Sequence, residues 1–366
     1  MRCRAVLHVI ACLLASLAFG MPAFAADDLR VSGPIIHDNL AIYLLHGSAA
    51  RGVVPLTLQE ALVKGSVKVE ETGSVNALTV ENTGADEVFV QAGDIVKGGR
   101  QDRVLSVDLL LPPHSGRTAI AAFCVEAERW SARGNEDSRR FSSANAAMPS
   151  HEAKLAMRTH AAAVAAVADA RVAAPAAAPE SPSRSASAEA YAASSAVQQQ
   201  EVWKTVKITQ ERLSHALGEL VIAPTSPSSL ELSLENEKLK EAQTSYLAAL
   251  SDAGEAADDI VGYVFAINGK IDGGDVYASN ALFRKMWRKQ LAANVTEAIG
   301  KKDMAGAAAP SVKEIEAFLS VPAGVAKVER AINANVRLAT AERNSMLYAE
   351  TRRPDGSWVH KNYLVR

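Results

Sequence analysis

Hydrophobic and polar residues alternate with a period of two over much of residues 39–130, as is typical of β-strands with one buried face. The alternation is clearest over Arg103–Leu111, which we expect to form one strand. Shorter predicted strands lie at Leu40–Leu45, Val67–Glu70, Val75–Glu81, Glu87–Ala92 and Thr118–Glu126, with Gly- or Asn-containing turns between several of them. A short helix is expected from Thr57, where Glu60 completes a capping box. These strands predict an antiparallel sheet or sandwich.

Apolar residues recur with helical spacing from about residue 197 to residue 320. Helices are expected at Val202–Leu220, Leu234–Leu250, Ser279–Ala298 and Ser311–Leu319, with one strand among them at Asp259–Ile267. The end of the chain, residues 324–366, again has β character, with a turn at residues 354–356. The simplest architecture is an α+β fold, whose sheet is built from N- and C-terminal strands around a helical middle section.

Two segments fall outside this pattern. Between Ala161 and Gln200, 18 of 40 residues are Ala, mixed with Ser and Pro, and Leu, Ile, Phe and Trp are missing. Such a composition buries little apolar surface, so we expect a disordered insertion at about residues 144–196, with Ala173–Ala188 as a flexible loop. The rest of residues 26–366 is then one large α+β domain.

The other segment, residues 1–25, has the three parts of a secretory signal peptide. Arg2 and Arg4 precede an apolar stretch at Ala5–Phe19, and residues 23–25 read Ala-Phe-Ala, a cleavage pattern. We therefore expect a periplasmic or secreted bacterial protein, cleaved near Ala25. No later stretch reaches 18 apolar residues, so we expect no transmembrane segment in the mature chain.

The amino-acid composition of the chain restricts the classes of function that it can have. The mature chain would have 37 basic and 41 acidic residues, a net charge of −4, and its aromatic content is low. A nucleic-acid binder needs a basic surface, so we expect no nucleic-acid partner. Only Cys124 would remain after cleavage, which leaves no internal disulfide. The histidines show no zinc-binding spacing, and no metal is predicted.

One segment, residues 92–103, combines glycines with charged side chains. Its candidate ligand-binding residues are Asp94, Lys97, Arg100, Gln101, Asp102 and Arg103. Glycine backbone can turn with its N–H groups exposed, and such a nest beside Lys and Arg can hold an anion. The same residues are equally typical of a tight loop with an internal Asp–Arg ion pair.

The segment Cys124–Trp130 provides further candidates. A carboxylate beside a thiol makes a poor nucleophile, so we expect Cys124 to be a small buried residue. Glu126 and Arg129 are candidates either for a ligand site or for a buried ion pair. Trp130 is expected in the core or as a pocket wall.

Five motifs of the chain look familiar together: Phe89–Arg103, Cys124–Trp130, Val261–Lys270, Asp275–Phe283 and Trp358–His360. Together they resemble one family, the ADP-ribosylglycohydrolase- and rhodanese/phosphatase-superfamily-associated protein domain, and the resemblance spans about residues 39–366. The resemblance implies no established activity, catalytic residue or cofactor. By analogy with the enzymes in the family's name, it makes a nucleotide- or ADP-ribose-related ligand plausible.

The sequence leaves three functions open. The first is a binding module for a small phosphorylated, nucleotide-like or sugar-like anion, held by the residues of the two segments. The second is a hydrolase with Asp102 or Glu126 as general base, in which the carboxylate must lie about 3 Å from a reacting water. The third is a structural or interaction protein of the cell envelope. Catalytic residues, cofactors and oligomeric state are not assigned.

Overall fold

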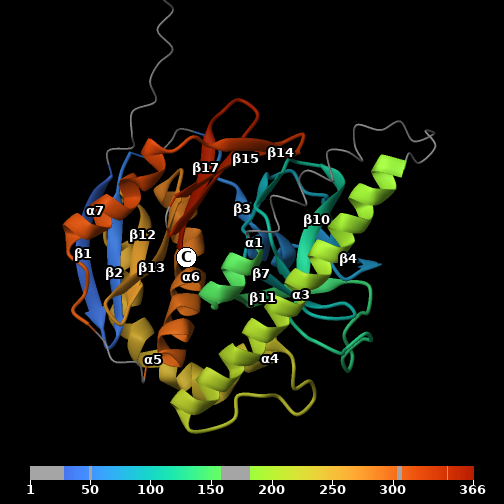
Figure 1. The fold of residues 1–366 in the computed structure, drawn as a ribbon, viewed down its shortest axis with the longest axis horizontal. Coiled ribbons are helices and arrows are strands. Elements are labelled where there is room, and N and C mark those ends of the chain that lie inside the picture. The colour runs from blue at the N-terminus through green and yellow to red at the C-terminus, as the bar shows by residue number, and fades with distance from the viewer. Residues whose placement is uncertain (1–28, 49–51, 158–181, 303–306, 344) are drawn as a thin grey trace, which may run out of the picture.

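The computed structural model describes residues 29–48, 52–157, 182–302, 307–343 and 345–366, with the backbone alone for residues 182–194. The predicted signal peptide at residues 1–25 and most of the predicted loop at residues 173–188 lie outside the described residues. Over the described part, three β-sheets and a set of helices form a mixed α+β fold (Figure 1), as the sequence predicts.

The largest sheet has eight strands in the order β1-β2-β12-β13-β17-β16-β15-β14, all antiparallel. Its strands are β1 (Arg30–His37), β2 (Leu40–His46), β12 (Ile260–Ile267), β13 (Lys270–Tyr277), β14 (Val328–Asn333), β15 (Val336–Arg343), β16 (Met346–Arg352) and β17 (Trp358–Val365). Strands from both ends of the described chain therefore share one sheet. Because β17 pairs with β13, His360 lies opposite Tyr277 and Asn362 opposite Asp275.

The N-terminal β-region forms two smaller sheets. A six-stranded sheet, in the order β11-β7-β8-β10-β5-β4, contains β4 (Val67–Ser74), β5 (Ala77–Asn82), β7 (Asp94–Gly98), β8 (Arg103–Leu105), β10 (Gly116–Cys124) and β11 (Phe141–Ala147). A three-stranded sheet contains β3 (Leu56–Thr57), β6 (Val88–Val90) and β9 (Leu109–Leu111). The chain between β8 and β9 therefore passes from one sheet to the other.

Helix α6 (Asn280–Gly300) stands between the eight-stranded sheet and the N-terminal sheets (Figure 1), in contact with β12, β13 and β11. The other helices are α1 (Leu58–Val63), α3 (Pro182–Leu217), α4 (Leu230–Leu234), α5 (Glu237–Leu250) and α7 (Val312–Ser320), with two 3-10 turns at Ser251–Glu255 and Val321–Gly324. Helices α3 and α5 pack on α6, whereas α7 covers the outer face of the large sheet near β1. Among the described helices, none is long and apolar enough to cross a membrane.

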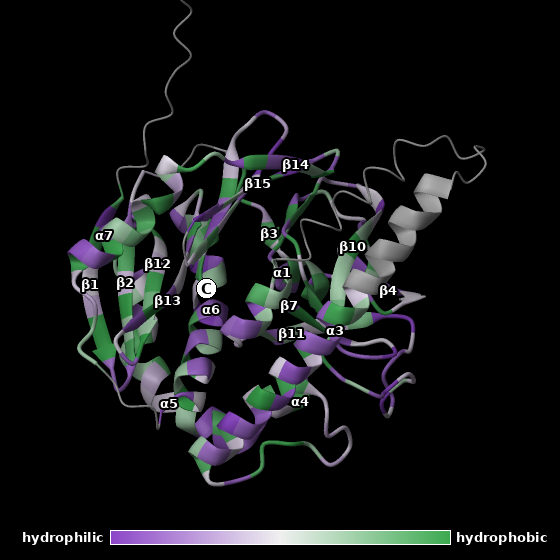
Figure 2. Cartoon of the chain, in the orientation of Figure 1, coloured by the Kyte–Doolittle hydropathy of each residue, from purple (hydrophilic) through white to green (hydrophobic). Residues whose placement is uncertain are grey.

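The main hydrophobic core lies around α6, where Trp287 and Phe283 are fully buried against Tyr263 and Tyr277 of the large sheet. A second cluster fills the N-terminal sheets, and a third lies between the large sheet and α7. The inner strands are correspondingly apolar, with green colouring along β2 and β12 in Figure 2.

Most of the predicted elements appear in the structure. Thr57 caps α1 with the predicted capping box, and Ser279 caps α6. Of the predicted insertion at residues 144–196, the first residues belong to β11 and to a helical segment at residues 151–157, and α3 begins at Pro182. The helix predicted at Leu234–Leu250 is α5, which begins at Glu237 because Asn236 is its N-cap; Leu234 ends the preceding helix α4.

The prediction of a single strand over Arg103–Leu111 is wrong. The structure has two strands, β8 and β9, in two different sheets. Residues of both predicted faces are buried, so the alternation does not separate a core face from a solvent face. The physical reason for the break is Asp108, whose carboxylate accepts hydrogen bonds from the backbone of Ala92 and from the distant Thr351.

Candidate functional site

The two segments singled out by the sequence meet in space. The backbone N–H of Asp102 donates to the Glu126 carboxylate at 3.0 Å, and the side-chain amide of Gln101 donates to the Glu126 carbonyl at 2.9 Å. The backbone N–H of Val125 in turn donates to the Asp102 carbonyl at 3.0 Å. The loop after β7 and the end of β10 are therefore tied together by both backbone and side chains.

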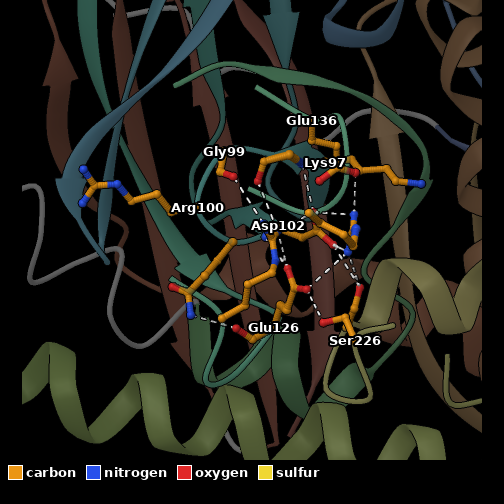
Figure 3. Close-up of polar contacts among 12 residues, drawn as sticks. Lys97, Gly99, Arg100, Asp102, Glu126, Glu136 and Ser226 are labelled. Carbon is orange, nitrogen blue, oxygen red and sulfur yellow. Dashed lines mark hydrogen bonds and ion pairs between the residues drawn. The ribbon is translucent and has the colours of Figure 1, made fainter. Parts of the chain in front are cut away.

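Asp102 and Glu126 are the centre of a group that we call the Asp102–Glu126 cluster (Figure 3). It contains Asp102, Glu126, Arg129, Arg133, Ser226 and Ser229. Both carboxylates are fully buried. Two arginines face the two acids, so the formal charges of the cluster cancel.

Every carboxylate oxygen in this cluster accepts a hydrogen bond. Arg133 bridges the two acids, at 3.0 Å from Asp102 Oδ2 and 3.2 Å from Glu126 Oε1. Arg129 lies 2.5 Å from Glu126 Oε2, and Asp102 Oδ1 accepts from the backbone N–H of Gly98 at 2.9 Å. A buried carboxylate needs such compensation, because an unpaired charge in the interior is very costly.

The environments of the two acids push their pKa values apart. Burial, followed by the charge of Glu126, raises the pKa of Asp102. Burial would also raise the pKa of Glu126, but hydrogen bonds from Arg129, Ser226 and the Asp102 backbone lower it below its ordinary value. Glu126 is therefore the acid that keeps its negative charge more firmly.

The glycine nest is occupied by the protein itself. Gly98 and Gly99 have positive φ values of 116° and 57°, and a side chain at Gly99 would collide with the Phe141 ring. The Gly98 N–H is used by Asp102, and the carbonyls of both glycines accept from Arg129. Asp102 therefore pairs with Arg129 and Arg133, which lie outside the loop, and not with an arginine of the loop as the alternative interpretation expects.

The other predicted residues of this region divide into paired and exposed side chains. Lys97 pairs with Glu235 at 2.5 Å, and the fully buried Arg103 lies 3.5 Å from Glu71. Asp94 is away from the cluster and binds Lys289 at 2.5 Å. Arg100 points away from the cluster (Figure 3).

Of the two places expected for Trp130, the core is excluded, and its role as a pocket wall stays a prediction. Its side chain is 44% exposed, and the guanidinium groups of Arg100 and Arg103 lie over its ring at 5.2 and 5.8 Å. An indole can stay at the surface when cations cover its face.

Cys124 is buried as predicted, and burial raises the pKa of its thiol to about 11.

A second buried group of acids and bases lies where the large sheet meets the N-terminal sheets. This His360 cluster contains Asp108, Asp275, His360, Tyr263, Thr351 and Asn362. His360 Nδ1 lies 2.8 Å from Asp108 and Nε2 lies 3.0 Å from Asp275. Burial would lower the pKa of His360, but the two carboxylates raise it to about 9.

The sequence did not single out Arg133, Asp108 or His360 as site residues. Arg133 lies in an irregular segment, residues 125–140, that has no helical or strand period to orient it. Asp108 and His360 are 252 residues apart, and only the pairing of β17 with β13 brings them to one place. Within the described residues, no three His, Cys, Asp or Glu side chains are arranged to hold a metal ion.

Comparison with protein families gives one match. The family model of the ARG and Rhodanese-Phosphatase-superfamily-associated Protein domain matches residues 28–364. No curated protein and no solved structure matches.

Proposed function

This chain belongs to the ARG and Rhodanese-Phosphatase-superfamily-associated Protein domain family, and we propose that it is a binding module for a small phosphorylated anion. The ligand would lie in an open surface groove beside the Asp102–Glu126 cluster. The observation that carries the proposal is the convergence of three arginines on this groove, two of which have no ion pair among the described residues.

The groove has a volume of about 480 Å³. It is lined by Glu70, Glu71, Thr72, Gly73, Arg100, Arg117, Ser138 and Arg139. Arg117 is 63% exposed and pairs with Glu70 at 2.7 Å, whereas Arg100 and Arg139 make no ion pair within the described part of the chain. The planar guanidinium group matches phosphate oxygens in a bidentate geometry, so this composition favours a phosphate over a neutral sugar.

The buried cluster supports this surface by fixing the loop that carries Arg100. Asp102 and Gln101 anchor one side of the loop through Glu126, and the Gly99 N–H donates to the Arg140 carbonyl at 3.0 Å on the other side. The exposed Trp130 ring lies under the Arg100 guanidinium and limits its motion. A pre-positioned side chain loses less conformational entropy when a ligand binds.

The geometry gives less support to the hydrolase alternative. Asp102 and Glu126 are fully buried, and each of their oxygens already accepts a hydrogen bond. A general base needs an oxygen that can reach a reacting water at about 3 Å. We therefore assign these two acids to the support of the loop.

The test compares ribose 5-phosphate with ribose by isothermal calorimetry on the mature protein. We expect ribose 5-phosphate to bind and ribose to bind at least tenfold more weakly. Arg100→Ala and Arg139→Ala should each weaken binding about 10- to 100-fold, since a hydrogen bond to a charged group is worth about 1.5–3 kcal/mol. Higher salt should weaken binding as well.

The matched control is Arg288→Ala, which removes an exposed arginine of α6 that pairs with Glu255 far from the groove. It should bind like the wild type. Two results would contradict the anion groove: equal binding of ribose and ribose 5-phosphate, or an equal loss of affinity in all three arginine variants. Either would favour the alternative of a structural or interaction protein of the envelope.

We further propose that the protein is exported to the periplasm or secreted, which rests on the sequence of residues 1–25. The mass of the protein recovered from a periplasmic fraction of a bacterial host tests this. We expect the mass of a chain whose first residue lies near Ala26. A chain that keeps residues 1–25 and stays with the cytoplasmic fraction would refute export.

A further inference from the structure

A small pocket lies against the His360 cluster, at the junction of β13, β17 and α6 with two loops of the N-terminal sheets. Asp275 of the cluster lines it, together with Gln91, Ser106, Lys154 and Gln290. Its volume is about 20 Å³, which is room for one or two water-sized groups. The pocket is therefore matched to the polar end of a molecule.

Several polar side chains that line the pocket have no partner in the described part of the protein. Ser106 is 1% exposed, and its hydroxyl makes no hydrogen bond there. Gln290 is 4% exposed, and no hydrogen bond of its side-chain amide is found among the described residues. The Gln91 oxygen accepts from Tyr277, which leaves its amide nitrogen for the pocket.

Such groups indicate a binding site because an unsatisfied buried donor or acceptor is unfavourable by about 1–3 kcal/mol. The Ser106 hydroxyl is such a group in the described part of the protein, whereas more than nine in ten buried polar groups of a native interior are paired. Buried side-chain atoms without a hydrogen bond also occur elsewhere in the described residues, for example Arg129 Nε of the Asp102–Glu126 cluster, but the Ser106 hydroxyl lines a cavity.

The charges around the pocket balance. Asp108 and Asp275 provide two negative charges, the His360 imidazolium between them provides one positive charge, and Lys154 provides the other. Burial raises the pKa of the Asp275 carboxyl, but the hydrogen bond and charge of His360, the hydrogen bond from Tyr263 and the smaller effect of the Lys154 charge lower it below its ordinary value. A balanced site favours an uncharged ligand, because a charged one would enter a buried space without a counter-ion.

The hydrogen-bond donors and acceptors that line the pocket then restrict the chemical class of the ligand. Asp275 accepts from His360, Tyr263 and Asn362, which fills three of the roughly four lone-pair positions of a carboxylate. Lys154, Ser106 and the Gln91 nitrogen are donors. The ligand group must donate one hydrogen bond to Asp275, accept hydrogen bonds from these donors, and consist of two or three heavy atoms. A primary carboxamide meets all three conditions. We propose that this pocket binds the carboxamide end of a small uncharged molecule.

Three probes of four heavy atoms test the proposal on the mature protein. Acetamide, acetate and acetamidinium have nearly the same shape but are neutral, negative and positive. Ligand-observed NMR titrations should show acetamide binding at least tenfold more tightly than either ion. Tighter binding of acetate or acetamidinium would overturn the charge argument. No binding of any probe up to about 0.1 M would make this a water-holding pocket only.

Two substitutions distinguish a loss of ligand binding from a loss of stability. Gln290→Met keeps the length of the side chain and Ser106→Ala removes only the hydroxyl, and both should weaken acetamide binding at least tenfold. Neither side chain hydrogen-bonds to a described residue, so the melting temperature should stay the same or rise. Unchanged acetamide binding in both variants would refute the assignment. Arg100→Ala, at the separate anion groove, should bind acetamide normally, so this test and the phosphate test fail independently.

Discussion

The two buried clusters differ in what surrounds their carboxylates. In the Asp102–Glu126 cluster, two acids face two arginines, and backbone N–H groups and serines occupy the remaining oxygens. In the His360 cluster, one imidazole joins Asp275 of β13 to Asp108 of the segment between β8 and β9, and beside it lies a pocket lined by the unpartnered Ser106 hydroxyl. Both clusters are equally well buried.

This difference shows that burial of charged groups does not by itself indicate a functional site. Fully hydrogen-bonded carboxylates and balanced charges are what a structural support needs, since an uncompensated buried charge is destabilising. A polar group without a hydrogen bond beside a cavity destabilises the free protein. Its presence is explained if a ligand in the cavity supplies the missing hydrogen bond. The first cluster therefore supports a surface, and the second borders a site.

The largest effect is expected from Arg133→Met. Arg133 contacts Asp102, Glu126 and Glu136, and its loss leaves the two buried carboxylates of the cluster with Arg129 as their counter-charge, one positive charge for two negative ones. The free energy of unfolding, measured in urea, should fall by about 3–5 kcal/mol. The control Arg288→Met removes an exposed ion pair and should change it by less than about 1 kcal/mol. Equal effects of the two variants would show that the first cluster is not a support.

The His360 cluster should give the fold a pH dependence. The folded pKa of about 9 lies above the ordinary value of 6.5, so the folded state holds a proton that the unfolded state releases. The stabilisation is complete below about pH 6.5 and is lost as the pH rises through 9, by up to about 3 kcal/mol.

Comparison with His360→Gln isolates this contribution, because Gln can hydrogen-bond to the acids but does not titrate. The difference in unfolding free energy between wild type and variant should shrink from pH 6 to pH 10. A difference that stays constant over this range would mean that His360 is neutral in the folded protein.

Cys124 gives a smaller and local test of the first cluster. Its thiol donates to the Glu126 carbonyl at 2.8 Å, so Cys124→Ala should cost about 1 kcal/mol of unfolding free energy. In the native wild type, the raised thiol pKa and full burial should make alkylation by iodoacetamide about a hundredfold slower than in urea. Rapid native labelling would show that this region opens to solvent.

The smallest effect on stability is expected at the pocket. Gln290→Met should change the unfolding free energy by less than about 0.5 kcal/mol, or raise it, because no protein hydrogen bond is lost. Circular dichroism melts of this variant and of Arg133→Met, side by side, measure the contrast directly. A loss of more than about 2 kcal/mol would place Gln290 in the structural network and remove the distinction between the two clusters.

The sequence by itself determined the elements whose signals are local. The capping residues Thr57 and Ser279, the α+β class and the burial of Cys124 follow from short patterns of polarity and from side-chain size. The convergence of residues 92–103 with Cys124–Trp130 could be suspected because both belong to one compact β-region.

The tertiary structure decided what each charged side chain does. The period of two over Arg103–Leu111 predicts one strand, yet Asp108 leaves the ladder to bind His360, 252 residues away. Of the arginines expected to hold a ligand, Arg129 binds Asp102 and Glu126 and Arg103 lies against Glu71. Arg100 faces the groove without an ion pair among the described residues. Local patterns report which residues avoid water, whereas the partner of a buried charge is set by long-range strand pairing, which no short stretch of sequence encodes.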